Sequence, residues 1–339
     1  MRKYLIVLVC FTLVLASCAK KGPQEIDVTD FVLGTVCTIK VAQGGDRAVV
    51  DKAFARLHRL EADLTVNKPG SQLDEVNAKS GMAPVKVGPD AIAIVKRGLV
   101  YSAESDGAFD QTVGPLVQLW GIGLKKNPKV PDRKDIEAAR KLINWKDVVV
   151  DETAGTIFLK RPGMGLDLGS ASKGYAADEV AKILTAGGVT SAIIDLGGNI
   201  LVVGGKPDGQ PWRIGLQNPD SERGTYVGVA SLVGQTMVTS GVYERFFIQD
   251  GVRYHHIMDT KTGFPVRNGL TSVTVITTKS FDADGVTTML FALGREKGMA
   301  LANKLGLETI WLDDQKRVYM TPGTSKVFEI TDPSYTLAE

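Results

Sequence analysis

The spacing of apolar residues predicts helices that occur in clusters along the chain. Residues 46–64 place apolar side chains at helical intervals, so an amphipathic helix is expected there. A proline near a first turn marks the start of a second helix, and a Gly-Gly pair marks the end of a longer one. The pattern predicts helices at 46–64, 89–105, 112–120, 171–186, 281–293 and 295–305.

Strand signals have a different distribution. Residues 31–41 are rich in alternating β-branched side chains and are predicted to form one strand, while residues 191–275 contain mostly strands separated by glycine turns. Short turns suit antiparallel pairing. We therefore predict an α+β fold of largely antiparallel sheets with flanking helices, and not a doubly wound parallel sheet. A G-x-G-x-x-G sequence between a strand and a helix, the mark of a Rossmann domain, is absent.

The first 17 residues have the composition of a secretory signal peptide. Two basic residues precede an apolar run too short to span a membrane comfortably, and Ala16-Ser17 then precede Cys18. This ending resembles the bacterial lipobox, whose cysteine is acylated after the preceding peptide is removed. The alternative is an ordinary secreted protein with a chance cysteine. We predict a signal peptide at 1–17, a lipidated tether at 18–28 and one large domain at 29–335, in an exported protein anchored to a bacterial membrane on its extracytoplasmic or periplasmic side.

Charge and cysteine content argue against several classes of protein. The formal net charge is +2, and it falls to zero when residues 1–17 are removed, so no basic surface for nucleic acid is expected. Cys10 lies in the signal peptide and Cys18 would be lipidated, which leaves Cys37 without a disulfide partner. Only three histidines occur and two are adjacent, which argues against a zinc site.

One group of oxygen-bearing residues opens the helix predicted near residue 281. Asp284 and Thr288 are four residues apart, so they share one helical face. A carboxylate and a hydroxyl are hard oxygen donors that suit Mg²⁺. The alternative is that Asp282 or Ser280 caps the helix and Thr288 is simply buried.

A second group lies where a strand enters a Gly/Ser turn and a helix leaves it, at residues 165–178. The turn leaves backbone N–H groups free at a helix N-terminus, where an anion is stabilised. Lys173 stands in the first turn and is within reach of a bound phosphate. The alternative is a tight strand-to-helix turn with a surface lysine.

A third group is a run of small and aromatic residues at 105–116, which would let a flat ring approach the backbone. Within it, Asp110 has a plain alternative function as a cap for the helix expected near Thr112.

Two adjacent histidines form the fourth group. If residues 252–258 are a strand, His255 and His256 point to opposite faces, and only one of them can face a given cleft. A histidine near its ordinary pKa suits proton transfer. The alternative is that the histidine is a structural residue with satisfied hydrogen bonds.

In this order, the segments resemble the ApbE-type FAD:protein FMN transferases, over residues 33 to about 293. The matching segments are Gly34-Thr35, 107–110 through Trp120, 167–169 through 173–176, 195–199, Trp212, 239–241, 256–259, Thr262-Gly263, Pro265, Ala283-Asp284 and Thr288. Lipoprotein export is also usual in this family.

The resemblance implies an activity and a cofactor. Members of this family bind FAD in a cleft between lobes, use Mg²⁺ at its pyrophosphate, release AMP and attach FMN through its phosphate to a threonine of another protein. The implied acceptors are flavoprotein subunits of Nqr-type or Rnf-type membrane redox pumps, or other exported flavin-binding domains.

The resemblance also implies functions for individual residues. His256 matches the base that acts on the threonine hydroxyl. The implied metal contacts are Asp284, Thr288, Thr287 and Ser170. The positions that match the lining of the flavin nucleotide site are Leu33, Ala108, Phe109, Asp110, Asp167, Lys173 and Met258, with Asn67 in a further family loop.

Three departures from the family pattern bear on this expectation. Gln111 stands where the family often has proline, and the turn at 169–172 has less glycine and isoleucine than usual. Asn67 stands where a tyrosine is common, and asparagine cannot stack on the dinucleotide as an aromatic ring would. A looser FAD would expose its pyrophosphate to water, so hydrolysis of FAD to FMN and AMP is an alternative. A second alternative is a non-catalytic flavin-binding lipoprotein.

Overall fold

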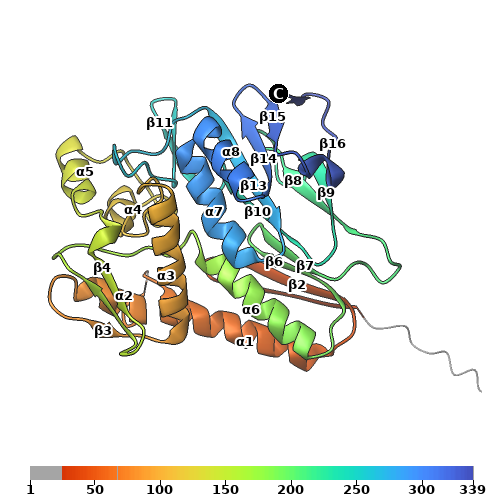
Figure 1. Ribbon diagram of the computed structural model, residues 1–339, viewed down its shortest axis with the longest axis horizontal. Coiled ribbons are helices and arrows are strands. Elements are labelled where there is room, and N and C mark those ends of the chain that lie inside the picture. Colours follow the sequence, from red (N-terminus) through yellow and green to blue (C-terminus); the bar gives the residue numbers. More distant parts are fainter. Residues whose placement is uncertain (1–24, 67, 339) are drawn as a thin grey trace, which may run out of the picture.

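The computed structural model is built around one nine-stranded sheet, and it describes residues 25–66 and 68–338. The strand order is β1-β2-β6-β7-β10-β13-β14-β15-β17, and every neighbouring pair is antiparallel except β15–β17 (Figure 1). Its strands are β1 (Ile26–Val32), β2 (Thr35–Gln43), β6 (Ser191–Leu196), β7 (Asn199–Val203), β10 (Thr236–Gly241), β13 (Leu270–Thr277), β14 (Glu308–Asp313), β15 (Arg317–Met320) and β17 (Thr336–Leu337).

Three smaller sheets accompany the large one. Their orders are β16-β9-β8, β3-β5-β4 and β11-β12. The strands are β3 (Val85–Lys86), β4 (Val148–Asp151), β5 (Thr156–Leu159), β8 (Trp212–Gln217), β9 (Tyr226–Leu232), β11 (Phe246–Gln249), β12 (Val252–His255) and β16 (Phe328–Ile330). The helices are α1 (Arg47–Leu64), α2 (Gln72–Ala78), α3 (Pro89–Glu104), α4 (Gly114–Trp120), α5 (Arg133–Arg140), α6 (Ser172–Ala186), α7 (Ser280–Leu293) and α8 (Arg295–Lys304).

Helices cover one face of the large sheet and the small β16-β9-β8 sheet covers the other. Helices α1 and α6 pack on the β1–β7 half, while α7 and α8 pack on β10, β13 and β14 (Figure 1). On the opposite face, Leu216 and Val227 of the small sheet share a buried cluster with Ile276 and Ile310 of the large one. The inner strands β6 and β13 therefore bury side chains on both faces, whereas the edge strand β17 is exposed. The N-terminus of α7 lies beside β7 and β10, because the Ser280 hydroxyl contacts the Asn199 side chain at 2.6 Å and that of Thr236 at 3.2 Å.

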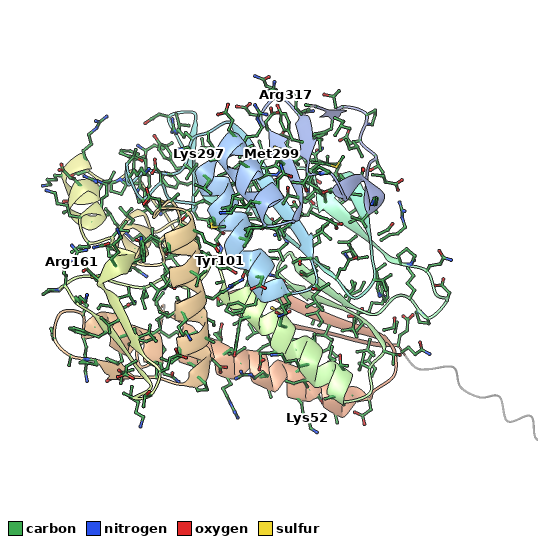
Figure 2. All side chains as sticks on the ribbon, viewed as in Figure 1. Lys52, Tyr101, Arg161, Lys297, Met299 and Arg317 are labelled. Atoms are coloured by element: carbon green, nitrogen blue, oxygen red, sulfur yellow. The ribbon has the colours of Figure 1, made fainter. Side chains whose placement is uncertain are left out.

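Helix α3 lies between α7 and the lobe that contains α2 and the β3-β5-β4 sheet (Figure 1). Tyr101 of α3 is fully buried near the centre of the molecule, and its hydroxyl donates to the carbonyl of Asp282 in α7 (Figure 2). At the other end of α3, Asp90 accepts two hydrogen bonds from Arg56 of α1, at 2.6 and 2.8 Å. The same guanidinium reaches Glu179 of α6 at 3.0 Å, so one arginine joins three helices.

The predicted α+β class with antiparallel sheets is confirmed, whereas the predicted single strand at 31–41 is wrong. The chain instead makes a two-residue turn between β1 and β2, with φ of +58° at Leu33 and +68° at Gly34. Two consecutive positive φ values match the twist of an antiparallel hairpin. Helices α2 and α5 were not predicted, and β1 begins at Ile26, inside the predicted tether.

Several sequence predictions fall outside the described residues. They are the signal peptide at 1–17, lipidation at Cys18, and the position of Asn67. Among the described helices, none combines the length and the apolar character that a membrane crossing requires. The cysteine in the described ranges, Cys37, is buried and its thiol contacts the carbonyl of Val32 at 3.4 Å.

Candidate active site

The N-termini of α6 and α7 are each bound by a carboxylate of the other helix. Asp284 of α7 accepts a hydrogen bond from the amide of Gly174 in α6, at 2.8 Å. In return, Asp178 of α6 accepts from the amides of Ser280 and Phe281 in α7, both at 3.0 Å. Neither helix has a side-chain cap at its own N-cap residue. Neither Asp282 nor Ser280 therefore caps α7, and the carboxylate that does so comes from another helix.

Glycine is required where the two helices meet. A Cβ atom added to Gly174 would lie 2.2 Å from the carbonyl oxygen of Ser280 and 2.7 Å from the Cβ of Asp284. Such distances are far inside van der Waals contact, so any larger residue would push α6 and α7 apart. This close approach places the carboxylate of Asp284 at the positive end of α6.

Three hydroxyl groups form a hydrogen-bonded cluster between β10 and α7. The Ser240 hydroxyl, at the end of β10, is 2.9 Å from that of Thr287 and 3.0 Å from that of Thr288. Thr287 in turn donates to the backbone carbonyl of Asp284 at 2.8 Å. Two of the predicted metal ligands, Asp284 and Thr288, therefore lie on the same helix, α7. Ser170, a further predicted ligand, lies in the turn that precedes α6.

The donor atoms in this group are chemically suited to Mg²⁺. Asp284 is only 5% exposed, and its burial raises its carboxyl pKa to about 6, an effect that the charge of Lys173 partly offsets. A nearby cation would favour the ionised form. Within the described ranges, no group of three or more His, Cys, Asp or Glu side chains could hold a metal. The arrangement instead combines one carboxylate with hydroxyl oxygens, and hard oxygen donors are what Mg²⁺ prefers.

Asp167 lies in the turn that precedes α6, and Lys173 is the second residue of that helix, as the sequence predicts. The Lys173 charge acts on Asp284, on Asp195 at the end of β6 and on His256 beyond β12. The Asp167 carboxylate accepts from the amide of Gly169 at 2.8 Å, and burial raises its pKa against the opposing charge of Arg245. The turn therefore brings a cation and a carboxylate to the same region as the α6 N-terminus.

The two adjacent histidines have different surroundings. His255 is the last residue of β12 and is buried, with Nε2 2.8 Å from the carbonyl of Val266. His256 follows the strand and is partly exposed; its amide donates to the Arg245 carbonyl at 3.1 Å, and its Nδ1 lies 3.3 Å from the same oxygen. The strand ends earlier than residue 258, yet the two side chains do separate into a buried one and an accessible one.

The contact with a carbonyl oxygen indicates which nitrogen of His256 carries the proton. A carbonyl can only accept, so the proton belongs on Nδ1 and the lone pair remains on Nε2. The ring is only partly exposed, and its loss of solvation, with the charge of Arg245 second, lowers the His256 pKa to about 3. The ring is therefore neutral at physiological pH, with Nε2 able to accept a proton.

The 108–110 segment is held mainly by its own side chains. Phe109 is buried and packs edge-on against Tyr101, with ring centroids 5.8 Å apart. Asp110 accepts from the amide and hydroxyl of Thr112, at 2.8 and 2.7 Å, and from the amide of Trp145 at 2.9 Å. Burial raises the Asp110 pKa. Helix α4 has Val113 as its N-cap, so Asp110 braces the loop but does not cap that helix. Ala108 is partly exposed.

The remaining predicted flavin contacts lie on separate elements. Leu33 is in the left-handed region in the β1–β2 turn, an unusual conformation for a branched residue. This turn lies beside the β6–β7 turn, because a Cβ on Gly197 would be 2.3 Å from the Thr35 hydroxyl oxygen. Met258 is buried in a cluster that also contains Trp120. The departure at Gln111 has a structural reason, since its amide donates to the Val95 carbonyl at 2.8 Å.

Sequence reasoning assigned no function to three residues of this region. Ser240 contacts both threonines of α7, Arg245 acts electrostatically on Asp167 and His256, and Asp195 lies within the field of Lys173. Ser240 and Asp195 lie within segments that carried the family resemblance. Their proximity to the site arises from pairing between strands far apart in sequence, which local patterns do not report.

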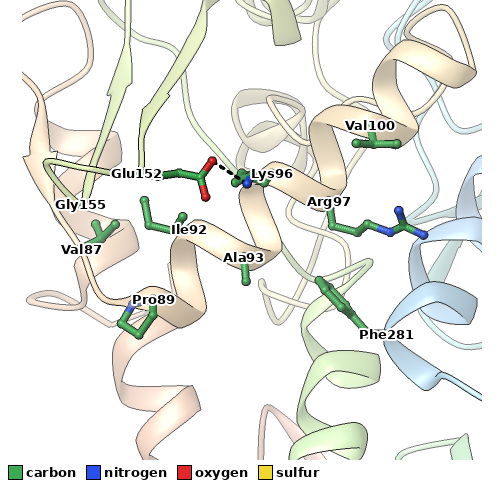
Figure 3. A pocket seen from close by; sticks show the side chains of 10 residues that line it. All are labelled: Val87, Pro89, Ile92, Ala93, Lys96, Arg97, Val100, Glu152, Gly155 and Phe281. Atoms are coloured by element: carbon green, nitrogen blue, oxygen red, sulfur yellow. Dashed lines mark ion pairs between the residues drawn. The ribbon is translucent and has the colours of Figure 1, made fainter.

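One surface groove of the described chain lies apart from this group. Its volume is about 670 Å³, and Figure 3 shows it along the outer side of α3, with Phe281 of α7 at one end. An ion pair of 2.6 Å between Lys96 and Glu152 crosses one edge. None of the residues predicted to bind FAD or metal lines the groove. The candidate active site is therefore identified by chemistry and helix geometry, and not by the size of a cavity.

Known proteins of one family resemble this chain in sequence over most of its length. A model of the ApbE family matches residues 33–311. A FAD:protein FMN transferase of Klebsiella pneumoniae (strain 342) is 39% identical over 295 residues, which are 87% of this chain and 91% of that protein. One from Treponema pallidum (strain Nichols) is 34% identical over 98% of this chain and 96% of that protein.

Solved structures show the same architecture. The crystal structure of the ApbE protein of Thermotoga maritima has a TM-score of 0.84 and 29% identity, over 90% of this chain and 99% of that one. The flavin transferase ApbE of Vibrio cholerae has a TM-score of 0.81 and 28% identity, with the same coverage of each chain. The sequence match over most of the chain and these shared structures lead to one conclusion: this chain belongs to the ApbE family.

Proposed function

We propose that the protein transfers FMN from FAD to a threonine hydroxyl of an acceptor protein and releases AMP. The observation that carries the proposal is the start of α6, where the Gly174 amide donates to the Asp284 carboxylate at 2.8 Å and the neighbouring Lys173 carries a charge that acts on both Asp284 and His256. A base for a hydroxyl and a carboxylate with adjacent hydroxyls therefore lie within the field of one cation. Relatives named FAD:protein FMN transferase match this chain over most of its length, which supports the same activity.

In this proposal His256 takes the proton of the threonine hydroxyl. The hydroxyl oxygen attacks the phosphorus of the FMN phosphate, the bond from that phosphorus to the bridging oxygen breaks, and AMP leaves with that oxygen. The proton moves to Nε2, which the Nδ1 contact with the Arg245 carbonyl keeps free. A pyrophosphate near Arg245 and Lys173 would offset the cations that lower the His256 pKa, making the ring a stronger base when FAD is bound.

Asp284, Thr287 and Thr288 would hold Mg²⁺, with Ser170 as a further ligand. The metal would supply positive charge for the pyrophosphate oxygens as charge develops on them. The protein itself adds the N-terminus of α6 and the ammonium group of Lys173 to the same region. Fixed donors of this kind stabilise developing charge without reorganisation.

FAD would lie along the turn at 167–173 and the elements around it. We propose side-chain or backbone contacts from Leu33, Ala108, Asp167, Lys173 and Met258, together with Asn67. Phe109 and Asp110 would act by shaping the backbone, because their side chains are occupied by Tyr101 and by the Thr112 and Trp145 amides.

We further propose that the enzyme works outside the cytoplasm, anchored to a membrane through lipid on Cys18. The support is the order of basic, apolar and small residues in 1–18. Acceptors would then be exported or membrane proteins with an exposed threonine, such as Nqr-type or Rnf-type redox subunits. Two acyl chains would hold a protein at a membrane far better than one.

One observation favours a second activity from the same site. Asn67 replaces the aromatic residue that the family commonly has in this loop, so FAD would lose a stacking partner. A less tightly held pyrophosphate is more open to water. Hydrolysis of FAD to FMN and AMP is therefore our second candidate.

One experiment separates these functions. Protein lacking residues 1–18 is incubated with FAD and Mg²⁺, with and without a threonine-bearing acceptor domain, and AMP and covalently bound flavin are measured. AMP formed only with acceptor, together with flavin on the acceptor, supports the transferase. AMP without acceptor supports hydrolysis, and tight flavin binding without AMP would mean a carrier. His256→Ala should keep FAD binding and lose most transfer, so full transfer by this variant would contradict the proposal.

A further inference from the structure

Strand β10 directs one of its faces at helix α7 (Figure 1). Alternation along the strand places Thr236, Val238 and Ser240 on this face. Val238 lies in the same buried apolar cluster as Val286 of α7, and the Thr236 hydroxyl lies 3.2 Å from that of Ser280 at the start of the helix. These contacts fix the strand and the helix in register, so that Ser240 lies beside the middle of α7.

The hydrogen bonds around Ser240 run in one direction. Thr287 donates its hydroxyl proton to the backbone carbonyl of Asp284 at 2.8 Å, and a carbonyl can only accept. The Ser240 hydroxyl must therefore donate to the Thr287 oxygen, at 2.9 Å. A hydroxyl group has a single proton, so Ser240 has none left for Thr288, whose oxygen is 3.0 Å away. It follows that Thr288 donates to Ser240, and that the chain of hydrogen bonds runs from Thr288 through Ser240 and Thr287 to the Asp284 carbonyl.

This direction leaves the oxygen of Thr288 ready for a cation. Its proton is turned toward Ser240, so both of its lone pairs remain free, whereas one lone pair of Thr287 already accepts from Ser240. Thr288 is also partly exposed, while Thr287 is fully buried. A hard cation binds oxygen lone pairs. Thr288 is therefore the hydroxyl of this cluster that is best arranged to bind a metal.

Without Ser240, the Thr288 hydroxyl would have a different partner within its own helix. A threonine in a helix commonly donates to the carbonyl three or four residues before it. Thr287 does so with Asp284. The carbonyl four residues before Thr288 is that of the same Asp284, yet the Thr288 hydroxyl contacts Ser240 instead. Ser240 thus competes with the helix backbone for the Thr288 proton, and its removal would let that hydroxyl turn inward.

We propose that Ser240 is a positioning residue for the metal site: it holds the Thr288 hydroxyl with its lone pairs directed at the cation. The inference rests on the proposed function, in which Asp284 and Thr288 are ligands of Mg²⁺, and it adds a residue that acts only through Thr288. Groups that orient a metal ligand typically contribute about 10–100-fold to metal affinity. Removing the Ser240 hydroxyl should therefore weaken metal binding although every proposed ligand is still present.

The test measures binding of Mn²⁺ alone to the purified, nucleotide-free protein, through loss of the electron paramagnetic resonance signal of free Mn²⁺. Mn²⁺ prefers the same oxygen ligands as Mg²⁺. Binding that excess Mg²⁺ displaces, and that Asp284→Ala weakens, identifies the proposed site. Ser240→Ala should raise the Kd for Mn²⁺ at this site about tenfold or more. In a Thr288→Val protein, which lacks the hydroxyl that Ser240 orients, adding Ser240→Ala should change the Kd less than about twofold.

Thr239→Val is the matched control. Thr239 is the neighbour of Ser240 in β10 and is also partly exposed, but its hydroxyl contacts that of Thr274 at 2.9 Å on the opposite face of the strand. This change removes a similar hydroxyl contact from the same strand, and it should leave the Kd for Mn²⁺ unaltered. Unchanged melting temperatures show that each variant is folded.

The inference is overturned if Ser240→Ala keeps the wild-type Kd for Mn²⁺, or if it lowers the affinity equally with and without the Thr288 hydroxyl. A loss of affinity in Thr239→Val as large as that in Ser240→Ala would also overturn it, because the effect would then belong to the strand and not to Thr288. If the wild-type protein binds no Mn²⁺ that Mg²⁺ displaces, or if Asp284→Ala binds it equally well, the metal site of the proposed function fails instead.

Discussion

The amide of Gly174 donates a hydrogen bond of 2.8 Å to the carboxylate of Asp284, across the contact between α6 and α7. The contact joins two segments that are 110 residues apart in sequence. It brings the N-terminus of one helix, which favours negative charge, to the carboxylate on the other helix that we propose as a metal ligand. The same close approach is what excludes a side chain at position 174.

Gly174→Ala should therefore damage the site and not merely the helix. The added methyl group would meet the Ser280 carbonyl oxygen at 2.2 Å, so α6 and α7 must separate. Overpacking of this kind costs about 1–3 kcal/mol of unfolding free energy. We expect that loss in urea denaturation, together with a higher Mg²⁺ concentration for half-maximal FAD turnover.

Gly165→Ala is the control for the Gly174 variant. Gly165 is also buried and has no positive φ, but an added Cβ would meet its nearest neighbour, Pro115, at an ordinary 3.5 Å. Its substitution should change the unfolding free energy and the Mg²⁺ dependence little. Equal effects of the two changes would show that the α6–α7 approach has no special importance.

Asp178 of α6 should stabilise α7 more than Asp282, the acidic residue in the first turn of α7 itself. Asp178 accepts from two amides of the first turn of α7, whereas Asp282 makes an exposed ion pair with Arg97. Loss of a capping carboxylate costs about 1–2 kcal/mol, and an exposed ion pair contributes less than about 1 kcal/mol. Asp178→Ala should thus lower the unfolding free energy well beyond Asp282→Ala, measured by urea titration at pH 7. The reverse order would mean that α7 is capped from within.

Much of the fold follows from local signals in the sequence. The helix at 47–64 buries Leu57 and Leu60 at the spacing that the pattern indicates, and Gly187 ends α6 where the pattern places the stop. The failures have local causes as well. Helix α5 is short and polar and buries only Ile136 and Ala139, which is too few apolar positions to produce a periodic signal.

The site was less accessible to sequence reasoning, because its geometry depends on contacts between distant segments. Spacing alone placed Asp284 and Thr288 on one face of α7, but it could not place Ser240 of β10 against both threonines of that helix. It also could not distinguish a side chain that faces a ligand from one that faces the core. Phe109 illustrates this, since its ring packs on Tyr101.

The backbone conformation of Leu33 should lower the unfolding free energy of the protein while it favours FAD binding. Its φ of +58° is unfavourable for a residue with a Cβ by about 1 kcal/mol, and the residue lies in the turn we propose to contact FAD. Leu33→Gly should therefore raise the unfolding free energy by up to about 1 kcal/mol and raise the KM for FAD. Thermal unfolding and initial rates measure the two effects. A variant that is more stable with an unchanged KM would show that the strain serves no purpose in binding.

His256 should remain neutral in the free enzyme well below the usual range for histidine. Loss of solvation and the charge of Arg245 lower its pKa to about 3, whereas in the unfolded chain it titrates near 6.5. The unfolded state therefore takes up a proton first, so this group favours folding above pH 6.5 and loses that contribution as pH falls toward 3. NMR of the metal-free protein should show no protonation of His256 between pH 8 and 5, and Arg245→Gln should raise its midpoint. A wild-type midpoint above 6, or no response to the Arg245 change, would contradict the assignment of a neutral base held beside a cation.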